Sequence, residues 1–105
     1  MQVEVTQNGG TIMVTPLEKR IDVHVAAAFR ALLLEQVDLG NRFILVNLAR
    51  VEFIDSSGLG ALVSTLKRIG RDGELKVCSP TDAVRSMFEL TRLNRVIPIT
   101  DPIAA

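Results

Sequence analysis

The residues with the clearest chemical potential in this sequence stand together at positions 55–57, where the carboxylate of Asp55 precedes the hydroxyls of Ser56 and Ser57. All three are residue types that begin helices, because their side chains accept a hydrogen bond from a free backbone N–H. A helix start also presents free N–H groups and the positive end of the helix dipole, which favour negative charge. The trio therefore predicts a helix N-terminus whose serines can carry a phosphate that a partner protein would detect.

The segments on either side of this trio indicate how it is positioned. Residues 43–48 before it are apolar and rich in strand-forming types. After it, apolar residues recur at helical spacing, at Leu59, Leu62, Val63, Leu66 and Ile69. We therefore expect the trio to lie at a partly exposed junction where a buried strand leads into a helix.

Helix capping by itself is an alternative explanation of the trio, because serine is common at helix starts. Two features favour a function beyond capping. Three consecutive capping residues are more than one helix start requires. Gly58 and Gly60 both fall in the first helical turns, where each glycine costs about 1 kcal/mol relative to alanine, and small residues there would leave the backbone open to a close-approaching protein.

The remaining residues offer little catalytic or metal-binding chemistry. His24 is the single histidine, and no spacing places it beside a serine, while a metal site needs several converging ligands. No nucleotide-binding G-x-x-x-x-G-K-[ST] sequence is present. Cys78 closes an apolar run, and we interpret it as a small buried residue and not as a nucleophile. We therefore expect no enzymatic activity, no cofactor and no metal site.

The composition favours a single domain over residues 1–105, since 48% of the 105 residues are hydrophobic and can form a core. The 12 basic and 12 acidic residues balance, which argues against a general attraction to nucleic acid or to anionic membranes. One cysteine allows no internal disulfide and suggests a reducing compartment. With neither a leader pattern nor an apolar run of membrane-spanning length, we expect a cytoplasmic protein.

The first half of the chain reads as a hairpin, a helix and a strand. Strands are expected at 2–6 and 11–15, joined by a turn at Asn8-Gly9-Gly10. Ile21-Asp22 fits a short extended piece before a helix, with Asp22 as a cap or as a ligand-facing carboxylate, and the helix closes at Gly40-Asn41. The apolar strand at 43–48 is expected to be parallel to its neighbours and covered on both faces.

The second half alternates helix and strand. We expect a helix over about 57–69, a strand over 75–78, a helix that begins at 79–82, a strand over 96–99 and a loose tail over 100–105. The last helix would present one packed face, formed by Ala83, Val84, Met87, Phe88 and Thr91.

The predicted order is therefore β-β-α-β-α-β-α-β. Because strand and helix alternate after the hairpin, we expect a single α/β domain with a mixed, mainly parallel sheet and helices packed against it. An exposed first strand could pair with a second copy, so we expect a monomer or a weak dimer.

The segment Phe53-Ile54-Asp55-Ser56-Ser57-Gly58-Leu59-Gly60 resembles the signature of bacterial anti-sigma factor antagonists, which belong to the STAS-domain family. The resemblance covers nearly the whole chain. It extends to Ile21-Asp22, to Val46-Asn47-Leu48, to Cys78-Ser79-Pro80 and to 84–91. It departs at 18–20, where the family usually has a glycine, and after Ile99, where the family's usual final helix is short or missing.

This resemblance implies a STAS-type fold and a protein switch. Ser57 matches the serine that is phosphorylated by an anti-sigma factor that is itself a serine kinase, and Ser56 is the alternative acceptor. The unphosphorylated protein would bind this kinase and free a sigma factor, and a metal-dependent serine phosphatase would reverse the modification. Asp22 and Asp55 match positions near that serine, where they would face the partner or support the kinase.

We expect the partner to contact the junction and the exposed face of the helix that follows it. The candidate contact residues are Asp22, Asp55, Ser56, Gly58, Leu59, Gly60, Ser64, Lys67 and Arg68. Two alternatives remain at this point. One is a scaffold or partner-switch protein that controls secretion, motility or transport. The other is a small-ligand or nucleotide-binding domain that uses the same helix N-terminus.

Overall fold

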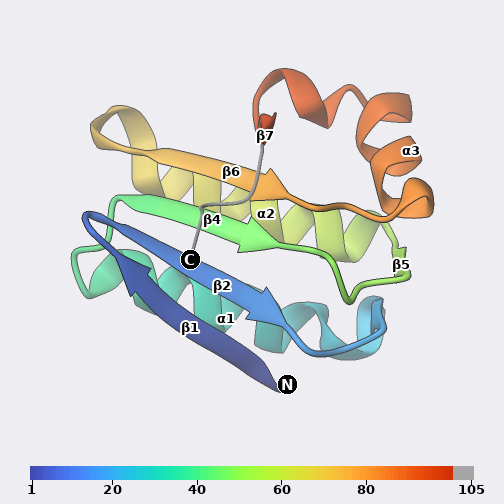
Figure 1. Ribbon diagram of the computed structural model, residues 1–105, viewed down its shortest axis with the longest axis horizontal. Helices are drawn as coiled ribbons and strands as arrows, with labels where there is room; N and C mark the ends of the chain where they lie inside the picture. The colour runs from blue at the N-terminus through green and yellow to red at the C-terminus, as the bar shows by residue number, and fades with distance from the viewer. Residues whose placement is uncertain (101–105) are drawn as a thin grey trace.

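The computed structural model describes residues 1–100 and is built on a five-stranded mixed sheet with the order β1-β2-β4-β6-β7 (Figure 1). β1 (Val3–Asn8) and β2 (Thr11–Pro16) form an antiparallel hairpin. β4 (Phe43–Asn47) pairs in parallel with β2 and with β6 (Glu74–Cys78), and β6 pairs in parallel with β7 (Ile99–Thr100). The predicted mixed, mainly parallel sheet is confirmed.

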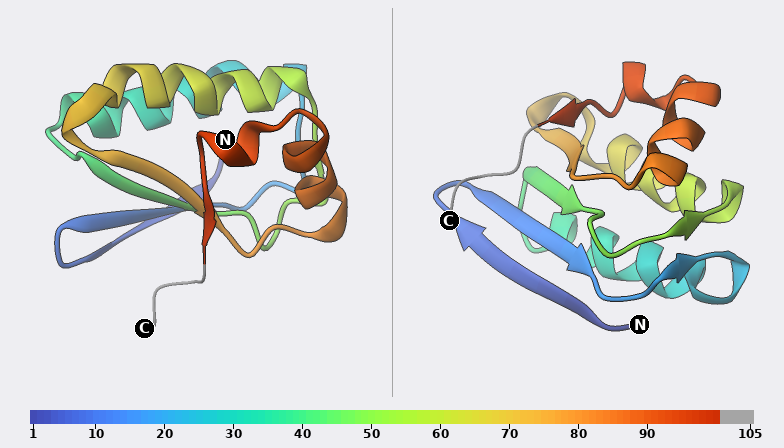
Figure 2. Two further views of the ribbon diagram at one scale, coloured as in Figure 1. Left: turned by 90° about the horizontal axis from the view of Figure 1, so that it is seen from above. Right: turned by 45° about the vertical axis from the view of Figure 1, so that its right-hand side comes forward.

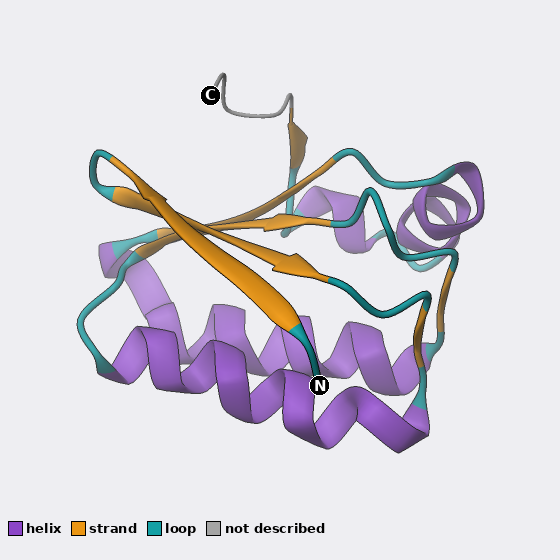
Figure 3. Cartoon of the chain, turned by 60° about the horizontal axis from the view of Figure 1, so that its bottom comes forward, coloured by secondary structure: helices purple, strands orange, loops and turns teal. Residues whose placement is uncertain are grey.

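The two long helices, α1 (Val23–Asp38) and α2 (Ser56–Ile69), lie on the same face of the sheet (Figures 2 and 3). Strand order increases steadily from β2 to β4 to β6, so two right-handed crossovers running in one direction place both helices on one side. The expected cover on both faces of 43–48 is therefore met only in part. Ile44 and Val46 point into the helix-side core. On the opposite face Leu45 is 3% exposed, whereas Phe43 is 45% exposed.

Two short strands, β3 (Arg20–Ile21) and β5 (Phe53–Ile54), form a separate parallel pair that was not expected as a sheet. The strand that leads into α2 is therefore β5 and not the central strand β4, which ends at Asn47. Two residues suffice here because the backbone of Lys19 and Ile21 accepts hydrogen bonds from the β5 segment, including Asp55 N to Ile21 O at 3.2 Å.

The end of the described chain differs from the expectation. α3 (Asp82–Leu90) is followed by a 3-10 helix, η2 (Leu93–Arg95), directly before the residues expected to form the last strand. Val96, the first of those residues, is the C-cap of η2, and 56% of its surface is exposed. The last strand is Ile99–Thr100 and not 96–99. Thr100 pairs with Cys78, so it does not belong to a loose tail, and residues 101–105 lie outside the described part of the chain.

The packed face of α3 is narrower than expected. Val84 and Phe88 are fully buried and Met87 is half-buried, but Ala83 and Thr91 are exposed.

The remaining short element is the 3-10 helix η1 (Gly70–Asp72), which occupies the predicted exit turn of α2.

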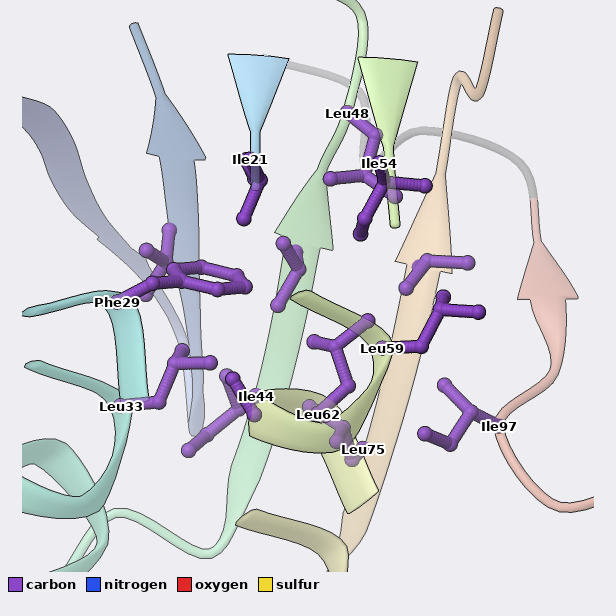
Figure 4. Packing of buried hydrophobic residues seen from close by; sticks show 14 of the residues in the cluster. Ile21, Phe29, Leu33, Ile44, Leu48, Ile54, Leu59, Leu62, Leu75 and Ile97 are labelled. Carbon is purple, nitrogen blue, oxygen red and sulfur yellow. The ribbon is translucent and has the colours of Figure 1, made fainter. Parts of the chain in front are cut away.

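The main core fills the space between α1, α2 and the sheet (Figure 4). Phe29 and Leu33 of α1 and Leu62 of α2 meet Ile44 and Leu75 of the central strands, and each is at most 2% exposed. This packing fixes the position of α2, whose first turn carries the serine pair.

Candidate functional site

The site is organised by β3 and β5, which bring two helix starts side by side. Ile21 is the register partner of Ile54 in this parallel pair, and each isoleucine is followed directly by an aspartate. Asp22 is the N-cap of α1 and Asp55 is the N-cap of α2. The positive ends of two helix dipoles therefore meet at one corner of the molecule, as Figure 3 shows for the starts of the two long helices.

The aspartates, not the serines, cap these helices. Asp22 Oδ1 accepts a hydrogen bond from the His24 N–H at 3.0 Å, and Asp55 Oδ1 accepts one from the Gly58 N–H at 3.1 Å. Among the described residues, the hydroxyls of Ser56 and Ser57 have no hydrogen-bond partner within the protein. Capping therefore explains Asp55 but leaves both serine hydroxyls available for other chemistry.

The two serines lie on different sides of α2, because successive helical residues are rotated by about 100°. Ser56 is exposed and Ser57 is half-buried. Ser57 shares its side of the helix with Ser64 and Arg68, and Arg68 Nη1 lies 2.8 Å from Asp38 Oδ1 at the end of α1. Ser57 is thus on the side of α2 that faces α1.

Ser56 lies beside a mainly apolar groove between α2 and the segment after α3. Its lining comes from both elements and consists of Ser56, Leu59, Gly60, Val63, Thr91 and Leu93. Thr91 and Leu93 were not predicted as site residues. Their contribution depends on how η2 folds back against α2, which no spacing in the sequence reveals.

Gly58 and Gly60 have different surroundings. Gly58 is buried, and a Cβ there would lie 2.6 Å from Ile54 Cγ1 and 2.8 Å from Ile21 O. Gly60 is exposed, and no described atom lies within 4 Å of the position its Cβ would take. Close packing of α2 on β3 and β5 therefore accounts for Gly58, whereas Gly60 leaves an open surface.

The other predicted contact residues also differ in how far they are exposed. Leu59 is 6% exposed and lines the groove, and Ser64 is half-buried. Lys67 and Arg68 are exposed in the last turn of α2.

Arg20 is a residue that the sequence did not single out. Its guanidinium lies 4.1 Å from the centre of the Phe53 ring, and its Nε lies 3.6 Å from Asp22 Oδ2.

Comparison with known proteins assigns the family. The STAS domain family model matches residues 2–105. This chain belongs to the STAS domain family. An anti-sigma-B factor antagonist of Staphylococcus aureus is 33% identical to it over 82 residues, which is 77% of this chain and 76% of that protein.

Solved structures agree with this STAS assignment. An anti-sigma factor antagonist from Mycobacterium paratuberculosis is 26% identical, has a TM-score of 0.85 and is matched over 93% of this chain and 83% of its own. The phosphorylated form of the Bacillus cell fate determinant SpoIIAA shares the fold, with a TM-score of 0.72 at 20% identity over 97% of this chain and 92% of its own.

Outside the serine pair, the described residues of this STAS domain offer neither an ionised thiol nor a metal-binding cluster. Burial raises the pKa of the Cys78 thiol, so the thiol stays neutral, which agrees with its interpretation as a buried residue. Residues 1–100 contain no group of three His, Cys, Asp or Glu side chains that could hold a metal ion. Within the same range, every helix is too short or too polar to cross a bilayer.

Proposed function

We propose that this STAS domain is an anti-sigma factor antagonist, a regulatory binding protein and not an enzyme, that works by partner switching. Its unphosphorylated form binds an anti-sigma factor that is a serine kinase, and phosphorylation of Ser57 blocks this binding. The observation that carries the proposal is the pair of free serine hydroxyls at the start of α2, which Asp55 leaves available by capping the helix itself. The relatives named as anti-sigma factor antagonists support it.

The position of Ser57 suits a reversible phosphate. Ser57 is the second residue of α2. The Asp55 cap engages the Gly58 N–H, so the Ser56 and Ser57 N–H groups have no acceptor among the described residues. A phosphate would add roughly −1.5 to −2 charges, which the helix N-terminus stabilises within the domain. The fold therefore tolerates the modification, and its effect falls on the partner.

The effect on partner affinity is expected to be large, because the phosphate adds its negative charge to that of two nearby carboxylates. Asp22 and Asp55 already lie at this corner, so the phosphate makes it strongly anionic. A partner surface that packs closely against the unmodified serine would be opposed by both charge and volume. We expect an affinity loss on the order of 100-fold or more.

The contact surface follows the exposed side of α2 from the junction. Ser56, Gly60, Lys67 and Arg68 are exposed there, with Ser64 half-buried between them. The apolar groove beside Ser56 gives the partner a place to bury a hydrophobic side chain. Gly58 acts indirectly in this proposal, because it is buried and sets the position of the helix. Leu59 is 6% exposed and contributes through the lining of the groove.

The test combines phosphosite mapping with kinase binding. The protein is purified from its native host, its intact mass is measured, and the modified residue is mapped. Pull-down of the kinase is then compared for the wild type, Ser57→Ala, Ser57→Asp and Ser86→Asp. Ser86 is an exposed serine on α3, so Ser86→Asp adds the same charge at a different place.

We expect phosphate on Ser57, kinase binding by the wild type, Ser57→Ala and Ser86→Asp, and strongly weakened binding by Ser57→Asp. A metal-dependent serine phosphatase should restore binding of the phosphorylated protein. Phosphate on Ser56 would keep the switch and move the acceptor to the groove side of α2. Ser57→Asp binding as tightly as wild type would contradict the proposal. Kinase binding without release of a sigma factor would favour control of secretion, motility or transport.

A further inference from the structure

β1 forms an open edge of the sheet. It is the outermost strand, its one neighbour in the described sheet is β2, and five of its six residues are exposed (Figure 1). Its sequence, Val-Glu-Val-Thr-Gln-Asn, contains neither proline nor lysine, two residues that commonly protect edges, and Glu4 is its single charged residue. Val5 is 44% exposed and lies outside the buried core. The strand therefore offers free backbone groups to another strand.

The hairpin register identifies which backbone groups are free. In a hairpin with a two-residue turn, the residues flanking the turn, here Asn8 and Thr11, form a hydrogen-bonded pair, and bonded pairs then alternate along the strands. Glu4 and Thr6 therefore bond inward to β2, and Val3, Val5 and Gln7 direct their N–H and C=O groups outward. The Leu17 N–H donating to Gln2 O at 2.9 Å fits the same alternation.

We propose that the protein self-associates through β1, with the strands of two copies antiparallel about a two-fold axis at Val5. In this register Val5 faces Val5 of the second copy, and Val3 faces Gln7 of the second copy. Three outward pairs then form about six backbone hydrogen bonds. The product is one continuous sheet that runs through both copies.

Charge excludes one neighbouring register and hydrogen bonding disfavours the other. A shift of two residues in one direction places Glu4 opposite Glu4 of the second copy, and like charges directly opposite each other repel. A shift in the other direction places Thr6 at the axis and keeps two outward pairs in place of three. The register centred on Val5 instead places Glu4 opposite Thr6 of the second copy, so no like charges meet.

This interface leaves the proposed phosphorylation site uncovered. β1 is at the edge of the sheet opposite β7, whereas the start of α2 follows β5 near the carboxyl ends of the central strands (Figure 1). A dimer would therefore present two serine pairs at once. Because the two surfaces are separate, dimerisation and kinase binding can each fail without the other.

The experiment measures the mass of the full chain by sedimentation between roughly 10 µM and 1 mM, since an interface of one strand per copy is small and weak. Four proteins are compared: the wild type, Val5→Lys, Val5→Glu and Ala83→Lys. Ala83 is exposed on α3, so Ala83→Lys adds a charge away from the edge. Circular dichroism establishes that each variant is folded.

We expect the wild type and Ala83→Lys to approach the mass of two chains as concentration rises. Val5→Lys alone and Val5→Glu alone should dimerise at least about 10-fold more weakly, since like charges then meet at the axis. An equimolar mixture of these two variants should dimerise again, because opposite charges meet in this register. As a measurement that needs no variant, the Val3, Val5 and Gln7 amides should exchange hydrogen more slowly at high concentration.

A wild type that stays monomeric throughout this range would overturn the proposal. So would dimers that Val5→Lys leaves unchanged, because the interface would then lie elsewhere. Recovery of dimers in the mixture, without recovery in either variant alone, would establish the register as well as the strand.

Discussion

At the scale of single residues, the start of α2 shows that the same residue type can be present for different structural reasons. Gly58 and Gly60 are two positions apart, and both carry the same cost of about 1 kcal/mol relative to alanine in a helix. Gly58 has no room for a Cβ between Ile54 and the Ile21 carbonyl, whereas Gly60 faces open space. Packing requires the first glycine, and a surface role is left for the second.

Alanine substitutions should separate these two causes. Gly58→Ala is expected to lower the free energy of unfolding by about 1–3 kcal/mol, because its Cβ would overlap Ile54 and the backbone of β3. Gly60→Ala should raise it by up to about 1 kcal/mol through helix propensity. Urea denaturation of both variants measures the difference. Equal effects of the two substitutions would contradict this account of the site.

At the scale of elements, the two-residue strands β3 and β5 matter more than their length suggests. Their register places Asp22 and Asp55 at equivalent positions, so α1 and α2 start side by side with the same kind of cap. Arg20 adds to this arrangement by lying over Phe53 and near Asp22. The corner that holds the serines is therefore built by backbone pairing across more than thirty residues of sequence.

The cap of α2 can be tested without touching the serines. Asp55→Ala is expected to lower the free energy of unfolding by about 0.5–2 kcal/mol, because the Gly58 N–H loses its acceptor. Asp55→Asn keeps an acceptor oxygen and should recover most of this loss. Thermal or urea unfolding gives both values. If Asp55→Asn were as destabilising as Asp55→Ala, the negative charge and not the hydrogen bond would hold the helix start.

At the scale of the whole molecule, one face of the sheet carries the main core, and both long helices supply it (Figures 2 and 4). Leucines that the sequence pattern does not distinguish differ in their position relative to this layer. Leu62 of α2 is fully buried, whereas Leu90 at the end of α3 is 80% exposed. The position of each leucine relative to this layer decides its contribution to stability.

These two leucines give a matched comparison of core and surface. Leu62→Ala should lower the free energy of unfolding by about 2–5 kcal/mol, because it leaves a cavity between α2 and the sheet. Leu90→Ala should change it by no more than about 0.5 kcal/mol. Chemical denaturation measures both. A loss at Leu90 comparable to that at Leu62 would show that the end of α3 is covered in solution, for example by a second copy.

Regular elements of this protein follow from local pattern. The hairpin, the parallel central strands and the three helices were all predicted, because alternation, helical spacing and turn residues are properties of neighbouring positions. β3, β5 and the position of β7 were not. Each of these strands has two residues, too few to show a period, and each exists because a distant backbone segment offers hydrogen bonds.

The serine pair was likewise identified from the sequence, because capping residues and glycines at a strand-to-helix junction are visible there. The sequence by itself determined the order of the main elements, the presence of a hydrophobic core and the location of the serine pair. The tertiary structure alone decided that Asp55 caps α2 and frees the serines, that Gly58 is a packing residue, and that Thr91 and Leu93 complete a groove beside Ser56. These depend on distances between residues far apart in the chain, and local sequence patterns carry no information about such distances.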